Sequence, residues 1–348
     1  MNGPKLSRRG LIGAAIAAGA TGAITPARAQ TDPTPVVPAD PADVARARAE
    51  HYETIALWPT TRFPGGAPEP VPAGLAEQTI ERAQPDEMPN RARKLTTAPR
   101  IEVLRPARPN GAALLIMPGG GYRYEVIDKE GYDIARRFAA QGVTGFVLNY
   151  RFPSDGWASG ADAPLADAQR AMRLIRAQAQ QFAIDPERIA AMGFSAGGHL
   201  CANLAAQFAR PAYQPFDAAD ALTARPCLAA AIYPAILVDQ FHRQPGGPPD
   251  LFGAGSTPAM LAQHTPSRHI PADAPPHWLL HAEDDPTVPP ENTLALRQAL
   301  IDRKIPVQTH MFERGGHGFA LRFTTGTPLA AWPDLFLAYA RSHGWIAA

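Results

Sequence analysis

Cysteine is nearly absent from this sequence. The 348 residues include only two, Cys201 and Cys227, and no cysteine and histidine cluster has the spacing of a metal site. A disulfide framework or a structural zinc site is therefore not expected to hold the fold together, and we expect no metal and no other cofactor. Cys201 falls in an expected buried helix and Cys227 just before an expected strand, so we interpret both as small core residues.

A surplus of either charge is also missing. The chain has 33 Lys and Arg against 32 Asp and Glu, a formal net charge of +1. Four of the basic residues and none of the acidic ones lie within the first 29 positions, so the remainder is slightly acidic. A chain without a basic face is not expected to bind nucleic acid or an anionic membrane surface.

The first 29 residues have the pattern of an export signal. Two arginines in SRRGLIG precede an Ala- and Gly-rich apolar stretch, and the tripeptide ARA ends at Ala29. This combination is typical of a twin-arginine signal peptide. The apolar stretch is short for the roughly 30 Å of a bilayer core, which argues against an anchor helix. We expect cleavage near Ala29, a periplasmic or secreted protein, and no membrane association of the mature form.

Residues 30–98 form a second region, rich in proline, alanine and charged residues. Residues 41–51 have the pattern of a short helix at best. The stretch IALWPTTRFPGGAP predicts an irregular segment laid against a domain. We therefore expect residues 30–98 to pack on, or to lead into, a main domain at residues 99–348.

In that main domain, short apolar strands alternate with longer helical patterns. Strands are expected at residues 101–105, 112–117, 144–150, 188–193, 228–234, 277–282 and 307–313. Helices are expected at residues 129–141, 162–182, 197–209, 291–304 and 332–344. Asp162 is placed to cap the second of these helices. The pattern predicts an α/β fold with a mostly parallel central sheet covered by helices on both faces.

The segment RIAAMGFSAGGHL, residues 188–200, places Ser195 between an expected strand and an expected helix. The pattern G-x-S-x-G at such a junction indicates a nucleophile elbow, a strained turn that lifts one hydroxyl above the sheet edge. Small residues two before and two after the serine keep the strand and helix backbones from clashing. We predict that Ser195 is a catalytic nucleophile rather than a simple helix cap.

A serine hydroxyl needs a base to take its proton and an acid to orient that base. In this architecture the three follow in the order serine, acid, histidine. VQTHMFERGGHGF supplies His317 between glycines after the last strand, and we prefer it as base over His199, one helical turn after the serine. Asp285 opens DPTVP and is the preferred acid, with Asp284 as the main rival and Glu283 as a third candidate.

Three consecutive glycines in MPGGGY, residues 117–122, follow another buried strand. A phosphate loop needs Lys-Ser/Thr after its glycines, and a dinucleotide site needs G-x-G-x-x-G entering a helix; this segment has neither. Enzymes with G-x-S-x-G require a second amide donor from the loop after an earlier strand. The amides of Gly120, Gly121 and Ala196 are therefore predicted to form an oxyanion hole, with a tight turn that binds nothing as the alternative.

Taken together, these motifs resemble those of the α/β-hydrolase superfamily. The matching segments are PGGGY, KEG at 129–131, YR at 150–151, IDPERIAAMGFSAGGHL, DPTVP and GGHGF. They look most like acetyl-xylan-esterase-like and hormone-sensitive-lipase-related carboxylesterases. The resemblance covers about residues 95–348, and IALWPTTRFPGG looks like a segment of the esterase-like group. Pro118 stands where the lipase-related branch carries the histidine of its HGGG, which favours the acetylesterase-like group.

The resemblance implies a serine carboxylesterase for short acyl esters, first of all acetyl esters of xylan or a related polysaccharide, with residues 99–348 as the catalytic domain. A feruloyl or aryl esterase is the nearest alternative. A serine peptidase of the prolyl-oligopeptidase type is less favoured, because residues 30–98 are too few for the propeller of such enzymes. An inactive binding protein on this scaffold is a third alternative. Residues 239–270 are expected to form a cap or rim, and the acyl group and the oligomeric state stay open.

Overall fold

The computed structural model describes the following residues: 40–60, 66–238, 252 and 256–347. All of them belong to one unit of the chain, Val36–Ala348. The export signal expected at residues 1–29 lies outside the described residues and stays a prediction. Within the described ranges, no helix is long and apolar enough to cross a membrane. Both cysteines are free; Cys201 is buried and Cys227 is partly buried.

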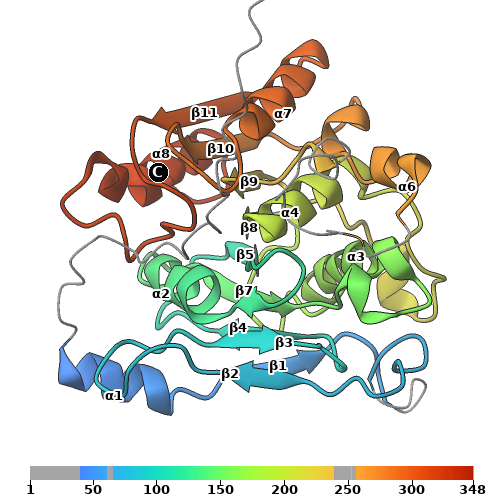
Figure 1. Cartoon of the computed structure of the whole chain (residues 1–348), viewed down its shortest axis with the longest axis horizontal. Helices are drawn as coiled ribbons and strands as arrows, with labels where there is room; N and C mark the ends of the chain where they lie inside the picture. Colours follow the sequence, from blue (N-terminus) through green and yellow to red (C-terminus); the bar gives the residue numbers. More distant parts are fainter. Residues whose placement is uncertain (1–39, 61–65, 239–251, 253–255, 348) are drawn as a thin grey trace, which may run out of the picture. The chain divides into compact units, whose positions relative to one another are not determined.

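A central sheet of eight strands organises the described part of the chain (Figure 1). From one edge to the other the strands are β1 (Glu53–Ala56), β4 (Arg100–Leu104), β7 (Thr144–Asn149), β5 (Ala113–Met117), β8 (Ile189–Phe194), β9 (Ala229–Ile232), β10 (His277–Ala282) and β11 (Val307–Phe312). β4 pairs antiparallel with both β1 and β7, whereas all neighbours from β7 to β11 pair in parallel. The carboxyl ends of the parallel strands therefore meet at one edge, where ligands bind in open α/β sheets.

Helices cover both faces of this sheet (Figure 1). The helices are α1 (Pro41–Ala49), α2 (Asp133–Ala139), α3 (Ala163–Ala177), α4 (Ala196–Gln207), α6 (Pro258–Gln263), α7 (Glu291–Asp302) and α8 (Trp332–Ser342). Successive residues of a strand point to opposite faces. In β9, Ala230 and Ile232 pack in the core cluster with α2 and α8, whereas Ala229 and Ala231 pack in the clusters with α3, α4 and α7. The sheet thus separates two layers of apolar core.

The strands and helices expected after residue 99 are confirmed in type and order. The helix expected at residues 129–141 begins as a π-helical turn, Asp128–Tyr132, and continues as α2. One detail is wrong: Asp162 stands at the N-terminal cap position of α3, but its side chain makes no capping hydrogen bond. The carboxylate instead pairs with the guanidinium of Arg210 at 2.5 Å and contacts Nε2 of His264 at 3.3 Å.

The expectation of an irregular segment before the main domain is partly wrong. Ile55 and Ala56 belong to β1, which pairs with β4 at the edge of the central sheet. Three of the four residues of β1 are exposed, so no apolar alternation marks this strand in the sequence. The antiparallel partner, rather than the local pattern, makes the segment a strand. The short helix expected at residues 41–51 is present as α1.

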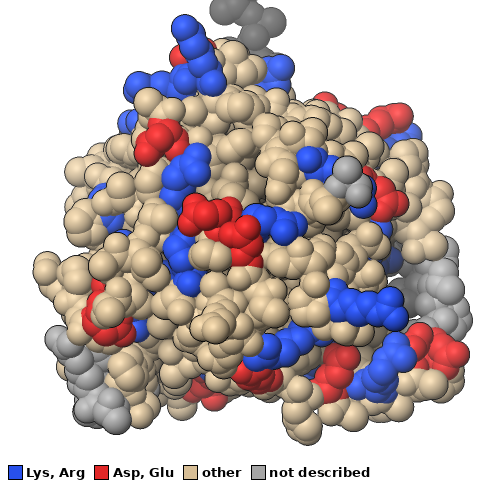
Figure 2. Space-filling model, turned by 180° about the vertical axis from the view of Figure 1, so that it is seen from behind, with Lys and Arg blue, Asp and Glu red and all other residues tan. Residues whose placement is uncertain are grey.

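One face of the molecule shows how its charged side chains are distributed. On the face drawn in Figure 2, Lys and Arg lie among Asp and Glu instead of gathering into one patch. This distribution agrees with the formal net charge of +1. Within the part of the chain that the structure describes, no group of three or more His, Cys, Asp or Glu could hold a metal ion.

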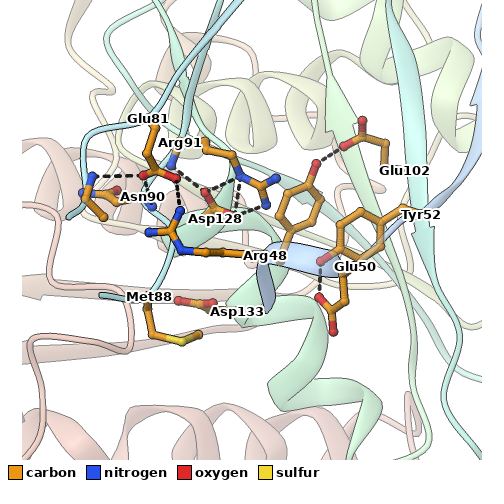
Figure 3. A network of polar contacts seen from close by, with 12 residues as sticks. Arg48, Glu50, Tyr52, Glu81, Met88, Asn90, Arg91, Glu102, Asp128 and Asp133 are labelled. Carbon is orange, nitrogen blue, oxygen red and sulfur yellow. Dashed lines mark hydrogen bonds and ion pairs between the residues drawn. The ribbon is translucent and has the colours of Figure 1, made fainter. Parts of the chain in front are cut away.

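A second, smaller sheet joins two strands from the segment before residue 99 to one strand of the main domain. Its strands are β2 (Gln78–Ile80), β3 (Ala92–Lys94) and β6 (Glu125–Val126), all antiparallel. Figure 3 shows the polar contacts near it, in which the guanidinium of Arg91 faces the carboxylate of Asp128. The shortest contact is 2.6 Å, and the Asp128 side chain is fully buried. Because Asp128 opens the π-helical turn, this charge-assisted pair fastens the N-terminal segment to that turn.

Candidate active site

Ser195 lies at the sharp turn between β8 and α4. Its backbone angles, φ of 53° and ψ of −117°, are unusual for a residue with a side chain. A Cβ at Gly197 would lie 2.0 Å from the carbonyl oxygen of Met117, and one at Gly193 would lie 2.0 Å from that of Gly197. Only glycine fits at these two positions, because strand, turn and helix backbones approach so closely. The steric reason given for the G-x-S-x-G pattern is confirmed.

His317 lies in the loop after β11 and contacts the serine. Its Nε2 is 2.9 Å from Oγ of Ser195, and its Nδ1 is 2.7 Å from Oδ2 of Asp285. The flanking Gly316 and Gly318 both have positive φ, 61° and 73°, so the loop bends sharply around the imidazole. The structure therefore brings together the three side chains predicted as nucleophile, base and acid. They come from loops at the carboxyl ends of β8, β10 and β11.

Two neighbouring aspartates after β10 make different hydrogen bonds. Asp285 is buried and contacts His317, whereas Asp284 is exposed and points to the backbone of the histidine loop. One oxygen of Asp284 accepts the amides of Gly315 and Gly316, both at 2.8 Å. The geometry thus selects Asp285 as the partner of the imidazole and leaves Asp284 to hold the loop that carries it. Glu283, the third candidate, is exposed.

Four donors surround the Asp285 carboxylate. Its Oδ1 accepts the amides of Thr287 and Val288 at 2.8 and 2.9 Å. Its Oδ2 accepts from His317 and, at 3.2 Å, from Nε2 of His281. Burial raises the pKa of Asp285, but the hydrogen bonds from the two histidines outweigh burial and lower the pKa to about 2. An ionised carboxylate at neutral pH keeps a proton on Nδ1 of His317, which leaves Nε2 able to accept one.

The contact of His281 with this carboxylate was missed from the sequence. His281 is fully buried in β10, and its Nε2 also donates to the carbonyl of Val288 at 2.9 Å. Its Nδ1 accepts the hydroxyl of Thr293 at 2.7 Å. Both ring nitrogens are therefore engaged. A histidine within an apolar buried strand, four residues before Asp285, is the signal that could have revealed it.

The glycine loop after β5 lies against the elbow. Among the hydrogen bonds of the described residues, none uses the amides of Gly120, Gly121 or Ala196 as donors. The amide of Gly119, in contrast, donates to Oε2 of Glu130 at 2.8 Å. Free amides in this loop and at the first residue of α4 are what an oxyanion hole needs. Their role toward a substrate stays a prediction.

His199, the less favoured candidate for the base, has a structural role. Its Nδ1 accepts the hydroxyl of Tyr122 at 2.7 Å, and its Nε2 donates to the carbonyl of His264 at 2.6 Å. Burial lowers the pKa of His199 to about 4. Because both nitrogens are occupied, this imidazole has no free position for the hydroxyl of Ser195. The contact with Tyr122 also ties the glycine loop to α4.

The cap or rim expected at residues 239–270 lies partly outside the described residues. Phe252 is described, and its ring centroid lies 6.2 Å from that of Tyr122 and 5.1 Å from that of His264. This part of the segment therefore packs close to the glycine loop. Whether residues 239–270 form a cap stays a prediction.

The parallel sheet with a strained serine between β8 and α4 defines an α/β-hydrolase. The BD-FAE family matches residues 104–222. A crystal structure of the acetyl ester-xyloside bifunctional hydrolase from Caldicellulosiruptor lactoaceticus is similar in fold, with a TM-score of 0.67 and 27% sequence identity. The similarity covers 85% of this chain and 97% of that chain.

Two curated proteins are similar in sequence to part of this chain. Endo-1,4-beta-xylanase B from Butyrivibrio fibrisolvens is 32% identical over 208 residues, which are 60% of this chain and 32% of that protein. The acetylxylan esterase from Xylanibacter ruminicola is 27% identical over 226 residues, which are 62% of this chain and 42% of that protein. The chain thus spans less than half the length of these two relatives. The chain has the α/β-hydrolase fold, and its sequence is similar to esterases of that superfamily, as its motifs predicted.

Proposed function

We propose that this protein is an exported serine carboxylesterase that hydrolyses short-chain acyl esters, first of all acetyl esters of xylan or a related polysaccharide. The observation that carries the proposal is the hydrogen-bonded series from Ser195 through His317 to Asp285, with distances of 2.9 and 2.7 Å. A serine activated in this way is the nucleophile of acyl transfer in several unrelated folds.

In the acylation step, Nε2 of His317 takes the hydroxyl proton of Ser195 while Oγ bonds to the acyl carbon. The imidazolium that forms is stabilised by the Asp285 carboxylate, which is ionised because its pKa is about 2. When the tetrahedral intermediate collapses, the bond to the alcohol breaks and the imidazolium gives its proton to the departing oxygen. The acyl group is then left on the serine.

The amides of Gly120, Gly121 and Ala196 hold the oxyanion of both tetrahedral intermediates. Removing one donor of this kind typically costs about 10²–10³ in kcat. In the deacylation step His317 takes a proton from water, whose oxygen attacks the acyl carbon, and returns that proton to Ser195. The cycle consumes one ester and one water and needs no cofactor.

Two observations support the substrate class and the location. The relatives include an acetylxylan esterase and a structure of an acetyl ester-xyloside bifunctional hydrolase. The twin-arginine pattern in residues 1–29 predicts a periplasmic or secreted enzyme, which would meet polysaccharide fragments there. The proposal includes no nucleic acid and no membrane as a partner of the mature form.

Acetate release from acetylated xylan tests the substrate class. The parent enzyme should release acetate from acetylated xylan and hydrolyse p-nitrophenyl acetate, and Ser195→Ala should abolish both activities. Methyl ferulate and peptide anilides serve as comparison substrates. Faster turnover of the ferulate ester would replace the acetylesterase proposal by a feruloyl esterase, and turnover of the anilides alone would indicate a peptidase.

Labelling with a fluorophosphonate probe tests the nucleophile itself. The probe should modify the parent at Ser195 and leave Ser195→Ala unmodified. Absence of labelling in the folded parent would contradict the serine-hydrolase mechanism and favour a binding protein on this scaffold. Fusion of residues 1–29 to a folded reporter tests export, and a reporter that stays in the cytoplasm would contradict the proposed location.

A further inference from the structure

Glu130 is a buried carboxylate without a part in the acyl-transfer steps. It lies in the π-helical turn Asp128–Tyr132 and is 3% exposed. Its two oxygens accept hydrogen bonds from two different segments of the site. Oε2 accepts the amide of Gly119 at 2.8 Å, and Oε1 accepts the hydroxyl of Tyr233 at 3.0 Å. Burial of a carboxylate is costly, so its position is set by the donors that satisfy it.

The first of these bonds fixes the start of the glycine loop. A Cβ at Gly119 would lie 2.8 Å from Oε2 of Glu130 and 2.9 Å from Cβ of Ser195. The Glu130 carboxylate and the Ser195 side chain thus both lie close to the position that a side chain at Gly119 would take. Because the Gly119 amide is held by Glu130, the chain is fixed directly before the free amides of Gly120 and Gly121.

The second bond holds an aromatic side chain that packs against the catalytic histidine. Tyr233 directly follows β9 and is fully buried, and its ring centroid lies 5.0 Å from that of His317 in an edge-on arrangement. Oε1 of Glu130 is 3.9 Å from the position that a Cβ at Gly318 would take. The carboxylate therefore lies beside the histidine loop and also orients an aromatic ring against which the imidazole packs.

The turn that presents Glu130 is itself anchored. Arg91, from the segment before β3, pairs with the buried carboxylate of Asp128 at 2.6 Å, as Figure 3 shows. The backbone amide of Arg91 donates to the same carboxylate at 2.5 Å. A shift of the π-helical turn would break this pair, so Glu130 is presented from a fixed support. Such turns inside helices occur frequently at functional sites.

We infer that Glu130 is a positioning residue that joins the oxyanion loop to the loop of the catalytic histidine and keeps both aligned with Ser195. The inference rests on the proposed function of that serine. Glu130 touches none of the reacting atoms and acts through Gly119 and Tyr233. Both carboxylate oxygens accept hydrogen bonds. A glutamine accepts through its oxygen and donates through its nitrogen to the tyrosine oxygen, so it preserves both contacts.

The test compares kcat and KM for p-nitrophenyl acetate in three variants. Glu130→Leu should lower kcat by about 100-fold and change KM little, because misplaced oxyanion donors weaken the transition state more than the bound substrate. Glu130→Gln should recover most of this loss. Tyr233→Phe should cause a smaller loss. The double variant Glu130→Leu/Tyr233→Phe should lose no more than Glu130→Leu, because Tyr233 acts on the same carboxylate.

Tyr213→Phe is the matched control. Its hydroxyl also donates to a buried carboxylate, that of Asp220, at 2.5 Å, but this pair packs against α3. The control should lower the melting temperature without lowering kcat. The inference is wrong if folded Glu130→Leu keeps kcat within about threefold of the parent, or if Tyr213→Phe loses as much kcat. If Glu130→Leu does not fold, Tyr233→Phe with parental kcat overturns the inference.

Labelling with the fluorophosphonate probe distinguishes a failure of the role of Glu130 from a failure of the proposed function of Ser195. A parent that is not labelled by fluorophosphonate contradicts the proposed function of Ser195 itself. A parent that is labelled, together with a folded Glu130→Leu variant that keeps parental kcat, contradicts only the role of Glu130. Labelling of Glu130→Leu that is slower than that of the parent supports the role, because phosphonylation uses the same oxyanion donors.

Discussion

Replacing Asp285 with asparagine should nearly abolish ester hydrolysis, although the two side chains have the same shape. In the structure, Oδ1 of Asp285 accepts the amides of Thr287 and Val288 at 2.8 and 2.9 Å. An asparagine has to keep its carbonyl oxygen at this position, so its NH₂ group turns toward Nδ1 of His317. Nδ1 must then accept instead of donate, and the ring proton moves to Nε2. In that tautomer the imidazole cannot take the proton of Ser195.

The size of the effect follows from this tautomer change. In a serine, histidine and aspartate triad, the wrong tautomer costs about 10⁴ in kcat. This factor corresponds to about 5 kcal/mol of transition-state stabilisation. The neighbouring substitution Asp284→Asn removes the same charge one position earlier and is the matched control. One oxygen of Asp284 accepts both glycine amides, and an asparagine oxygen can do the same. We expect kcat of Asp284→Asn within about threefold of the parent.

The assay measures kcat and KM on p-nitrophenyl acetate at neutral pH, after circular dichroism has established that both variants are folded. Two outcomes would refute the reasoning. Asp284→Asn could lose as much activity as Asp285→Asn, or Asp285→Asn could keep more than about a tenth of the parental kcat. The first result would mean that the charge of Asp284 matters as much as that of Asp285, and the second would mean that His317 is not oriented by Asp285.

Three further predictions follow from single contacts. Gly197→Ala should destabilise the fold by about 3 kcal/mol or more in urea unfolding, because its Cβ would lie 2.0 Å from a carbonyl oxygen; a parental midpoint would contradict this clash. Burial lowers the pKa of both His199 and His277 to about 4, so each contributes stability that is complete above pH 6.5 and lost as the pH falls toward 4. Urea unfolding should show on the order of 3 kcal/mol of stability lost per histidine over this pH range. His277→Phe should remove about half of this pH dependence. A variant with the parental pH dependence would contradict the lowered pKa of His277. His281→Phe should move the acid limb of the pH profile of kcat/KM to higher pH, because Asp285 loses a donor that stabilises its charge; an unmoved limb would mean that the contact at 3.2 Å is without effect.

Much of the main domain was predictable because its signals are local. Apolar runs such as those of β5 and β10 mark strands buried on both faces, and these were expected within a residue of their observed bounds. The elbow was predictable because its steric requirement falls within five consecutive residues around Ser195. His317 was predictable because its glycine-flanked loop follows the last strand, as the order of such sites requires.

The sequence by itself determined the order of the strands and helices, the position of the elbow and the loops in which the acid and base stand. Only the tertiary structure decided which of two adjacent carboxylates faces His317, since Asp284 and Asp285 have the same side chain in the same loop. It also made β1 a strand, through its pairing with β4. The contact of Glu130 with Tyr233 joins residues that are 103 positions apart. Hydrophobic periodicity and turn residues reflect local burial and local backbone geometry. Contacts between distant residues depend instead on how the strands pair and on which buried polar groups need a hydrogen-bond partner.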